Sequence, residues 1–263
     1  MLTYPNIDPV IIHIYGNLAI RWYSLAYIVG FLLCYWWLKF TNYGKTLISS
    51  DDCEKLLSWL ICGVVVGARL FDCIFYNLKE TISDPLSIFR VWEGGMSFHG
   101  GAIGVFCVFY LFSKKYKIPT LRILDYCLIM APLALFFGRI ANFINAELYG
   151  NITYTSPFRM VFPTDYLHQP RHPSQLYEAF AEGLCLFGAM FALYKKTDLV
   201  RASGVLTGAF GMMYSVARFV CEFFRRPEIG NLLGLTAGQW LSILMFGACC
   251  GFTIWRLKKA YII

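Results

Sequence analysis

Four arginines lie within long apolar stretches of this sequence, and such residues indicate an anionic ligand. They are Arg21, Arg69, Arg139 and Arg218. A guanidinium stays charged at any relevant pH, and placing one in hydrocarbon costs several kcal/mol unless it is paired or hydrated. We therefore expect a polar interior that receives an anion.

The densest polar cluster is the motif GRIANFINAELYG at residues 138–150. A helix here would place Arg139, Asn142 and Asn145 near one face, because they are three residues apart. Glu147 would follow just beyond the outer end of that helix. Arginine supplies charge and a planar donor fork, and asparagine adds neutral donors, so this face could hold a phosphate. A hydrogen-bond cluster that only joins helices explains the same pattern equally well.

A second cluster, YSVARFVCEFFRR, places Tyr214, Arg218 and Glu222 four residues apart on one helical face. Arg218 and Glu222 can pair, which lowers the cost of burying either one. A functional role for Arg218 is favoured, because apolar packing could replace a purely structural ion pair. Arg225 and Arg226 follow at the expected membrane interface, where snorkelling accounts for both.

The third cluster, WEGGMSFHGGAIG, carries His99 between two pairs of glycines. Glycines let the backbone approach closely and indicate an irregular entry to a membrane helix. His99 could accept a proton near the outer face. A histidine that only packs and hydrogen-bonds is the alternative.

Other polar residues in the apolar stretches have structural explanations. Glu178 and Glu182 are four residues apart and could balance the arginines. Arg69 could pair with nearby Asp72. Tyr23, at the outer end of the first apolar stretch, is typical of an aromatic belt.

Composition places the chain in a membrane. Its 263 residues are 58% hydrophobic and only 15% charged, which is too little polar surface for a soluble protein of this size. Seven segments are long enough to cross about 30 Å of hydrocarbon. These segments are about 18–40, 56–78, 94–112, 120–145, 173–194, 203–224 and 237–257. We predict an all-α integral membrane protein with seven transmembrane helices in a single polytopic domain, residues 1–263.

Basic residues set the orientation of this predicted bundle. Among the eleven lysines only Lys79 falls in a loop on the side opposite to the others. The positive-inside rule then puts the N-terminus outside and the C-terminus in the cytoplasm. Segments 79–93 and 146–172 are the external excursions. The net charge of +7 is thus a topology signal and does not indicate nucleic-acid binding.

Neither a metal nor another cofactor is expected. Ten cysteines and four histidines are present, but no CxxC or Cys/His spacing suggests a metal site. Most of the cysteines lie in predicted spans, where a thiol packs as a small hydrophobe. The sequence also lacks a nucleotide-binding motif.

These residues alone leave an enzyme and a transporter open. Arginine–glutamate pairs and glycine-interrupted spans suit a secondary transporter or anion pathway. Against it, the chain shows no internal repeat, and its polar clusters favour the outer half of the membrane. An intramembrane protease is not supported, because GxSG and paired-aspartate motifs are missing.

Five strings resemble one family in their order and spacing. They are GMSFHGG, GRIANFINAELYG, HPSQLYEAFAEG, YSVARFVCEFFR and TAGQWLSI. Together they resemble the bacterial phosphatidylglycerol–prolipoprotein diacylglyceryl transferases over nearly the whole chain. The resemblance implies a multi-pass inner-membrane enzyme with its active site toward the periplasm. It would move diacylglycerol from phosphatidylglycerol to the lipobox cysteine of a prolipoprotein signal peptide, forming a thioether and releasing glycerol phosphate.

The resemblance also implies two groups of site residues. The catalytic group is His99, Arg218, Glu222 and Tyr23. The phosphatidylglycerol-binding group is Arg139, Asn142 and Glu147. The chain departs from the family at Ala141, where glycine is common, and at Asn151, where an arginine is common. The first change is small. The second removes the residue that would give the family's basic contact at the mouth of the site.

The implied chemistry agrees with the arginines in the membrane. Breaking a carbon–oxygen bond to phosphate concentrates negative charge on the leaving group, which preorganised arginines stabilise best where water is scarce. The incoming thiol has a reference pKa of about 8.5, so a base of pKa about 6.5 could help to form the thiolate. His99 is the candidate base. The field of the arginines, acting without histidine, is the competing explanation.

Overall fold

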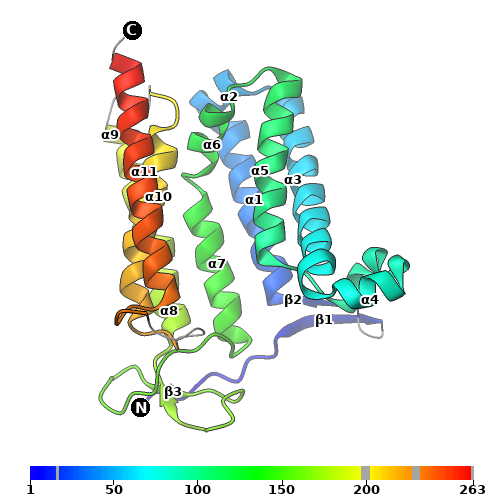
Figure 1. Ribbon diagram of the computed structural model, residues 1–263, viewed down its shortest axis with the longest axis vertical. Coiled ribbons are helices and arrows are strands. Elements are labelled where there is room, and N and C mark those ends of the chain that lie inside the picture. Colours follow the sequence, from blue (N-terminus) through cyan, green and yellow to red (C-terminus); the bar gives the residue numbers. More distant parts are fainter. Residues whose placement is uncertain (16–17, 197–201, 227–231, 262–263) are drawn as a thin grey trace. The chain divides into compact units, whose positions relative to one another are not determined.

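The computed structural model describes residues 1–15, 18–196, 202–226 and 232–261, and these are mainly helical (Figure 1). The described residues form two compact units. The first unit comprises Met1–Ile12, Ile20–Cys34 and Asp125–Ile263, and the second comprises His13–Ala19 and Tyr35–Leu124. The prediction of one polytopic domain stays a prediction.

The chain begins with two short strands that the sequence pattern did not predict. Strands β1 (Val10–Tyr15) and β2 (Leu18–Arg21) form a two-stranded sheet, and helix α1 (Trp22–Phe40) follows. The first predicted span therefore begins four residues later than expected. Arg21 is the last residue of β2 and is exposed, so the interpretation that it lies inside a membrane helix is wrong. Apolar residues in β2 extended the hydropathic stretch beyond the helix.

The second unit is built on two helices in close contact. Its elements are α2 (Asn42–Leu47), α3 (Ser50–Phe71), the π-helix η1 (Asp72–Tyr76), α4 (Leu78–Ser83), the 3-10 helices η2 (Pro85–Phe89) and η3 (Val91–Glu93), and α5 (Phe98–Tyr116). A Cβ on Gly67 would collide with the carbonyl oxygen of Gly100, so the backbones of α3 and α5 touch. Such contacts between small residues are typical of membrane helices.

The first unit contains the remaining helices. They are α6 (Thr120–Cys127), which begins in the second unit, α7 (Ala131–Ile144), α8 (Ser174–Glu178), the π-helix η4 (Ala179–Cys185), α9 (Leu186–Lys196), α10 (Val205–Glu222) and α11 (Ala237–Tyr261). Helices α6 and α7 are bent by 49° at their junction, where a continuous helix was predicted. Pro132 lies in the first turn of α7, where its missing N–H costs no hydrogen bond.

Glycines let the helices of the first unit pack closely. A Cβ on Gly183 of η4 would lie 2.7 Å from the Cβ of Phe136 on α7. A Cβ on Gly211 of α10 would collide with the side chain of Cys249 on α11. Helices α10 and α11 accordingly run side by side (Figure 1). The N-terminus of α10 is capped by the buried carboxylate of Asp125, which accepts hydrogen bonds from the backbone N–H groups of Gly204 (2.6 Å) and Thr207 (2.7 Å).

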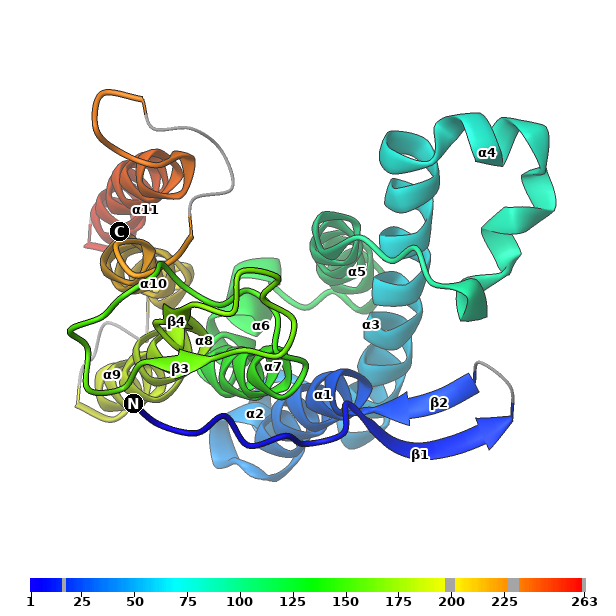
Figure 2. The same ribbon diagram turned by 90° about the horizontal axis from the view of Figure 1, so that it is seen from below.

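Segment 146–172 folds over the ends of α7 and α8 (Figure 2). Strands β3 (Met160–Val161) and β4 (Pro170–Arg171) pair antiparallel, with Met160 opposite Arg171. A small core joins this segment to the rest of the unit: Phe143, Ala146, Met160 and Phe162, packed against Tyr4, Tyr149 and Leu176. Arg171 makes a buried bidentate ion pair with Asp165, at 2.6 and 2.9 Å.

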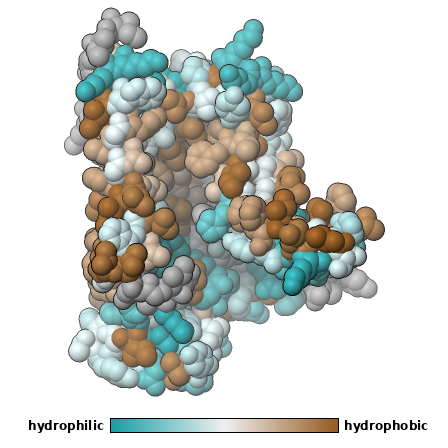
Figure 3. Space-filling model, viewed as in Figure 1, coloured by the Kyte–Doolittle hydropathy of each residue, from teal (hydrophilic) through white to brown (hydrophobic). Residues whose placement is uncertain are grey.

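The helices indicate a multi-pass membrane protein. By length and composition four helices of the described residues could cross a membrane, or five if the bent pair α6–α7 forms one span. The four are Trp22–Phe40, Ser50–Tyr76, Ser174–Lys195 and Ala237–Ala260. The other two predicted segments are also helical, as α5 and α10, but they are not among these candidates. Hydrophobic residues cover much of the shaft of α11, and hydrophilic residues gather at its C-terminal end (Figure 3).

Candidate functional site

Six charged side chains meet inside the first unit. Three are arginines and three are glutamates: Arg139 on α7, Glu178 on α8, Glu182 on η4, Arg218 and Glu222 on α10, and Arg225 just after α10. Their formal charges cancel. We call this set the charge cluster.

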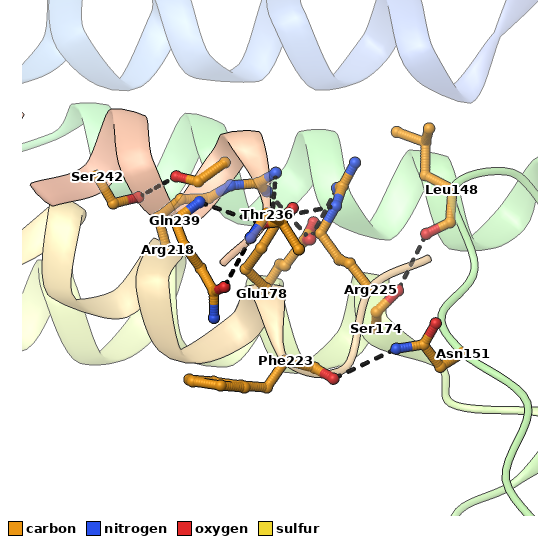
Figure 4. A network of polar contacts seen from close by, with 12 residues as sticks. Leu148, Asn151, Ser174, Glu178, Arg218, Phe223, Arg225, Thr236, Gln239 and Ser242 are labelled. Atoms are coloured by element: carbon orange, nitrogen blue, oxygen red, sulfur yellow. Dashed lines mark hydrogen bonds and ion pairs between the residues drawn. The ribbon is translucent and has the colours of Figure 1, made fainter. Parts of the chain in front are cut away.

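Glu178 and Glu182 lie at the centre of the charge cluster, and neither side chain is exposed. Glu178 contacts Arg139 (Nε to Oε2, 2.8 Å), Arg218 (Nη1 to Oε1, 3.2 Å) and Arg225 (Nη1 to Oε1, 2.8 Å). Figure 4 shows Glu178 between Arg218 and Arg225. Glu182 contacts Arg139 at 3.2 Å and Arg218 at 3.7 Å. The prediction that these glutamates balance the arginines is confirmed.

Glu222 completes the charge cluster from one turn further along α10. Its Oε2 lies 2.8 Å from Nη2 of Arg218, which confirms the predicted pair. It also lies 3.7 Å from Nε of Arg225.

Arg225 is a cluster residue that sequence reasoning missed. Its side chain is buried and pairs with Glu178, so the interpretation as an interfacial snorkelling residue is wrong. The chain turns after α10, and this turn is held by Asn151, whose backbone N–H and side-chain amide donate to the carbonyls of Phe224 (2.9 Å) and Phe223 (3.4 Å). A signal was present, because Arg225 follows Arg218 by seven residues, which is two helical turns.

A second polar group lies at the end of α7. Asn142 donates from Nδ2 to Glu147 Oε1 (2.7 Å) and to the hydroxyl of Tyr23 (3.5 Å). The chain folds back after α7 through Ala146, whose φ of +53° is left-handed. Glu147 thereby returns toward the helix, and its backbone N–H donates to the carbonyl of Asn142 (3.1 Å). Three predicted residues from α1, α7 and segment 146–172 thus come together.

Gln175 supports this second group and was not predicted. Its side chain is fully buried, and Nε2 donates to the backbone carbonyl of Glu147 at 2.6 Å. The neighbouring hydroxyl of Ser174 donates to the carbonyl of Leu148 (3.0 Å), a residue with a left-handed φ of +56°. The start of α8 therefore fixes the strained turn that carries Glu147.

The arginine and glutamate side chains of the charge cluster differ in their exposure. The side chains of Arg139 and Arg218 are 17% and 18% exposed, whereas Glu178 and Glu182 are not exposed at all. These two arginine side chains are thus more accessible than the glutamates with which they pair. The ion pairs with the buried glutamates hold each guanidinium in place.

Comparison with known proteins identifies the chain. The sequence model described as prolipoprotein diacylglyceryl transferase matches residues 9–255. The chain belongs to the prolipoprotein diacylglyceryl transferase family. It is 45% identical to the phosphatidylglycerol–prolipoprotein diacylglyceryl transferase of Ehrlichia ruminantium (strain Welgevonden) over 258 residues, 97% of this chain and 98% of that protein. It is 46% identical to the Rickettsia felis protein of the same name over 248 residues, 93% of this chain and 95% of that protein. Against the Rhodospirillum rubrum protein the identity is 45% over 252 residues, 93% and 90% of the two chains.

His99, the histidine expected for a diacylglyceryl transferase, belongs to the second unit. It lies in the first turn of α5, is exposed, and its ring centroid is 6.1 Å from that of Phe71. Its catalytic role stays a prediction.

Arg69 shapes the loop that precedes His99. Its guanidinium donates to the backbone carbonyls of Ser87, Ile88, Gly94 and Gly95. The predicted pairing with Asp72 is not among the ion pairs of the described residues, and the carboxylate of Asp72 accepts from Asn77 instead (2.9 Å). In this transferase, Arg69 therefore holds the turn at Gly94 and Gly95, because its guanidinium donates hydrogen bonds to the backbone carbonyls there.

Proposed function

We propose that this protein transfers the diacylglyceryl group of phosphatidylglycerol to the thiol of the lipobox cysteine of prolipoproteins. The products are a thioether-linked lipid and glycerol phosphate. The observation that carries the proposal is the charge cluster, in which Arg139 and Arg218 are more exposed than Glu178 and Glu182. It lies in a chain that is related over nearly its full length to proteins named phosphatidylglycerol–prolipoprotein diacylglyceryl transferase. The transporter alternative has no such support.

The proposed reaction is a displacement at carbon. The cysteine sulfur bonds to the diacylglycerol carbon that carries the phosphate, and the bond between that carbon and the phosphate oxygen breaks. The electron pair of that bond leaves with the oxygen on glycerol phosphate, so negative charge grows beside the arginines. The thiol proton passes to His99 in this proposal, and thiolate formation in the arginine field alone is the competing route.

Different parts of the site suit different steps. Arg139, Asn142 and Glu147 bind the head group: the guanidinium faces the phosphate, and the exposed carboxylate of Glu147 can accept hydrogen bonds from glycerol hydroxyls. Arg218, oriented by Glu222, stabilises the leaving phosphate. The ion pairs hold the guanidinium groups in position before substrate binds, so little reorganisation remains for the reaction itself.

The membrane arrangement is part of the proposal. In this arrangement the chain crosses the bacterial inner membrane seven times, with its N-terminus outside and its C-terminus in the cytoplasm. Segment 146–172 and the end of α7 would then lie on the periplasmic side. Exposed apolar side chains support an arm on the membrane surface at residues 79–93, because Ile82 (70% exposed), Leu86 (68%) and Phe89 (72%) face outward. Hydrophobic residues gather on this arm in Figure 3.

The test is transfer by the purified protein. The purified protein is incubated with phosphatidylglycerol and a lipobox peptide. The mass of the peptide is then measured by mass spectrometry, and the released glycerol phosphate is quantified. We expect a mass gain of one diacylglyceryl group with equimolar glycerol phosphate. A peptide with serine in place of cysteine, and Arg226→Lys outside the charge cluster, are the controls. No product from an intact, folded preparation would contradict the proposal.

A further inference from the structure

The start of α11 grips the carboxylate of Glu222. The hydroxyl of Thr236 donates to Oε1 of Glu222 at 3.1 Å. Two residues after Thr236, Gly238 leaves room for the same carboxylate. A Cβ on Gly238 would lie 2.6 Å from both Cδ and Oε1 of Glu222. The TAGQ sequence thus contacts Glu222 by one directed hydrogen bond and by close packing.

The direction of the Thr236 hydroxyl is determined by its neighbours. The backbone N–H of Gln239 donates to Oγ1 of Thr236 (3.2 Å), and the backbone N–H of Thr236 donates to Oε1 of Gln239 (3.0 Å). This reciprocal pattern is a capping box. The hydroxyl oxygen accepts from Gln239 through one of its two lone pairs, and its single proton points to Glu222, because a carboxylate oxygen accepts and does not donate. Figure 4 shows Thr236 and Gln239 beside Arg218.

Glu222 in turn connects Thr236 to an arginine of the charge cluster. Its Oε1 accepts a hydrogen bond from Thr236, and its Oε2 lies 2.8 Å from Nη2 of Arg218. Glu222 itself is buried, 6% exposed. The terminal torsion of a glutamate is soft, so losing the Thr236 hydrogen bond would let the carboxylate rotate and the Arg218 guanidinium move with it.

We propose that Thr236 is a positioning residue of the transfer reaction, which acts through Glu222 to aim Arg218 at the leaving phosphate. This inference rests on the proposed function. Gly238 has the same task by a different means, because any side chain there would push the carboxylate away. A helix cap without this task would contribute to stability alone.

Three variants separate positioning from capping. Thr236→Val keeps the shape and removes the hydroxyl, Thr236→Ser keeps the hydroxyl, and Gln239→Met removes the capping side chain while leaving the Thr236–Glu222 hydrogen bond. We expect Thr236→Val to lower kcat about tenfold with little change in KM for phosphatidylglycerol, as for the loss of one hydrogen bond to a charged group. Thr236→Ser should restore most of kcat. Gln239→Met should lower the melting temperature as Thr236→Val does, with kcat near wild type.

A double-mutant comparison tests the route through Glu222. In the Glu222→Ala background, Thr236→Val should have no further effect on kcat. The same fold loss in both backgrounds, or an equal loss of kcat in Gln239→Met, would overturn the inference. Gly238→Ala, with the hydroxyl intact, should also lower kcat and serves if Thr236→Val fails to fold. Absence of product from wild type refutes the proposed function, whereas wild-type kcat in folded Thr236→Val refutes only this inference.

Discussion

Arg139→Lys tests how the guanidinium of the head-group site is used. Arginine has five N–H donors. In Arg139, Nε contacts Glu178 and Nη2 contacts Glu182, which leaves three N–H donors for a phosphate. A lysine ammonium has three donors in all, so contact with both glutamates would leave one. The variant keeps the charge and loses the two-point contact with phosphate.

The magnitude follows from this donor count. Hydrogen bonds to charged groups contribute about 1.5–3 kcal/mol each. Losing one in the transition state lowers kcat/KM by roughly 10- to 150-fold, at about 1.4 kcal/mol per factor of ten. Stability should change little in Arg139→Lys, because a cation still faces Glu178 and Glu182. Arg139→Ala, in contrast, leaves two buried carboxylates one partner short and should cost about 3–5 kcal/mol.

The assay is the peptide-transfer reaction in detergent, with melting temperature measured on the same preparations. Arg226→Lys is the matched control, because Arg226 is exposed and lies outside the charge cluster. Wild-type kcat/KM in Arg139→Lys, or an equal loss in Arg226→Lys, would refute the reasoning.

Three further predictions concern other parts of the protein. Alanine variants of Arg218 and Glu222 should each be strongly impaired and the double variant little worse than either in the transfer assay, whereas additive losses would indicate separate roles. His99→Gln should lower transfer near neutral pH while phosphatidylglycerol binding is retained, and higher pH should recover part of the rate as the thiol ionises; an unchanged pH–rate profile would exclude His99 as the base. The hydrogen bonds of Arg171 lower the pKa of Asp165 from 3.8 to about 2, so this pair stabilises segment 146–172 fully above the ordinary pKa and loses that effect as pH falls toward 2. We compare amide hydrogen exchange of this segment after correction for the intrinsic exchange rate. As pH falls from about 3.8 to about 2, exchange should become faster in the wild type and stay unchanged in Asp165→Asn.

Local periodicity predicted the parts of the site that lie on one helix. Arg218 and Glu222 are one turn apart on α10, and their pairing follows from helix geometry. Glu178 and Glu182 were recognised in the same way. The positions of the helices followed from hydropathy, because apolar stretches of this length can be buried only in a membrane or a large core.

Tertiary contacts placed the residues that sequence reasoning missed. Arg225 returns to the charge cluster because the turn after α10 is held by Asn151, about 70 residues earlier in the chain. The hydroxyl of Tyr23 reaches Asn142 across 119 residues, and no local spacing encodes that contact. Thr236 is similar, since a capping box predicts the start of a helix but not which carboxylate lies against it.

The central claim is that the carbon–oxygen bond to phosphate breaks while the arginines stabilise the departing phosphate. Phosphatidylglycerol labelled with oxygen-18 in the bridge between the diacylglycerol carbon and phosphorus tests it in one measurement. Attack by sulfur at carbon sends the bridging oxygen away with the phosphate, so all of the label should appear in glycerol phosphate and none in the lipidated peptide. Label released in free diacylglycerol, with unlabelled glycerol phosphate, would mean that the phosphorus–oxygen bond breaks, and it would contradict the assigned role of Arg139 and Arg218.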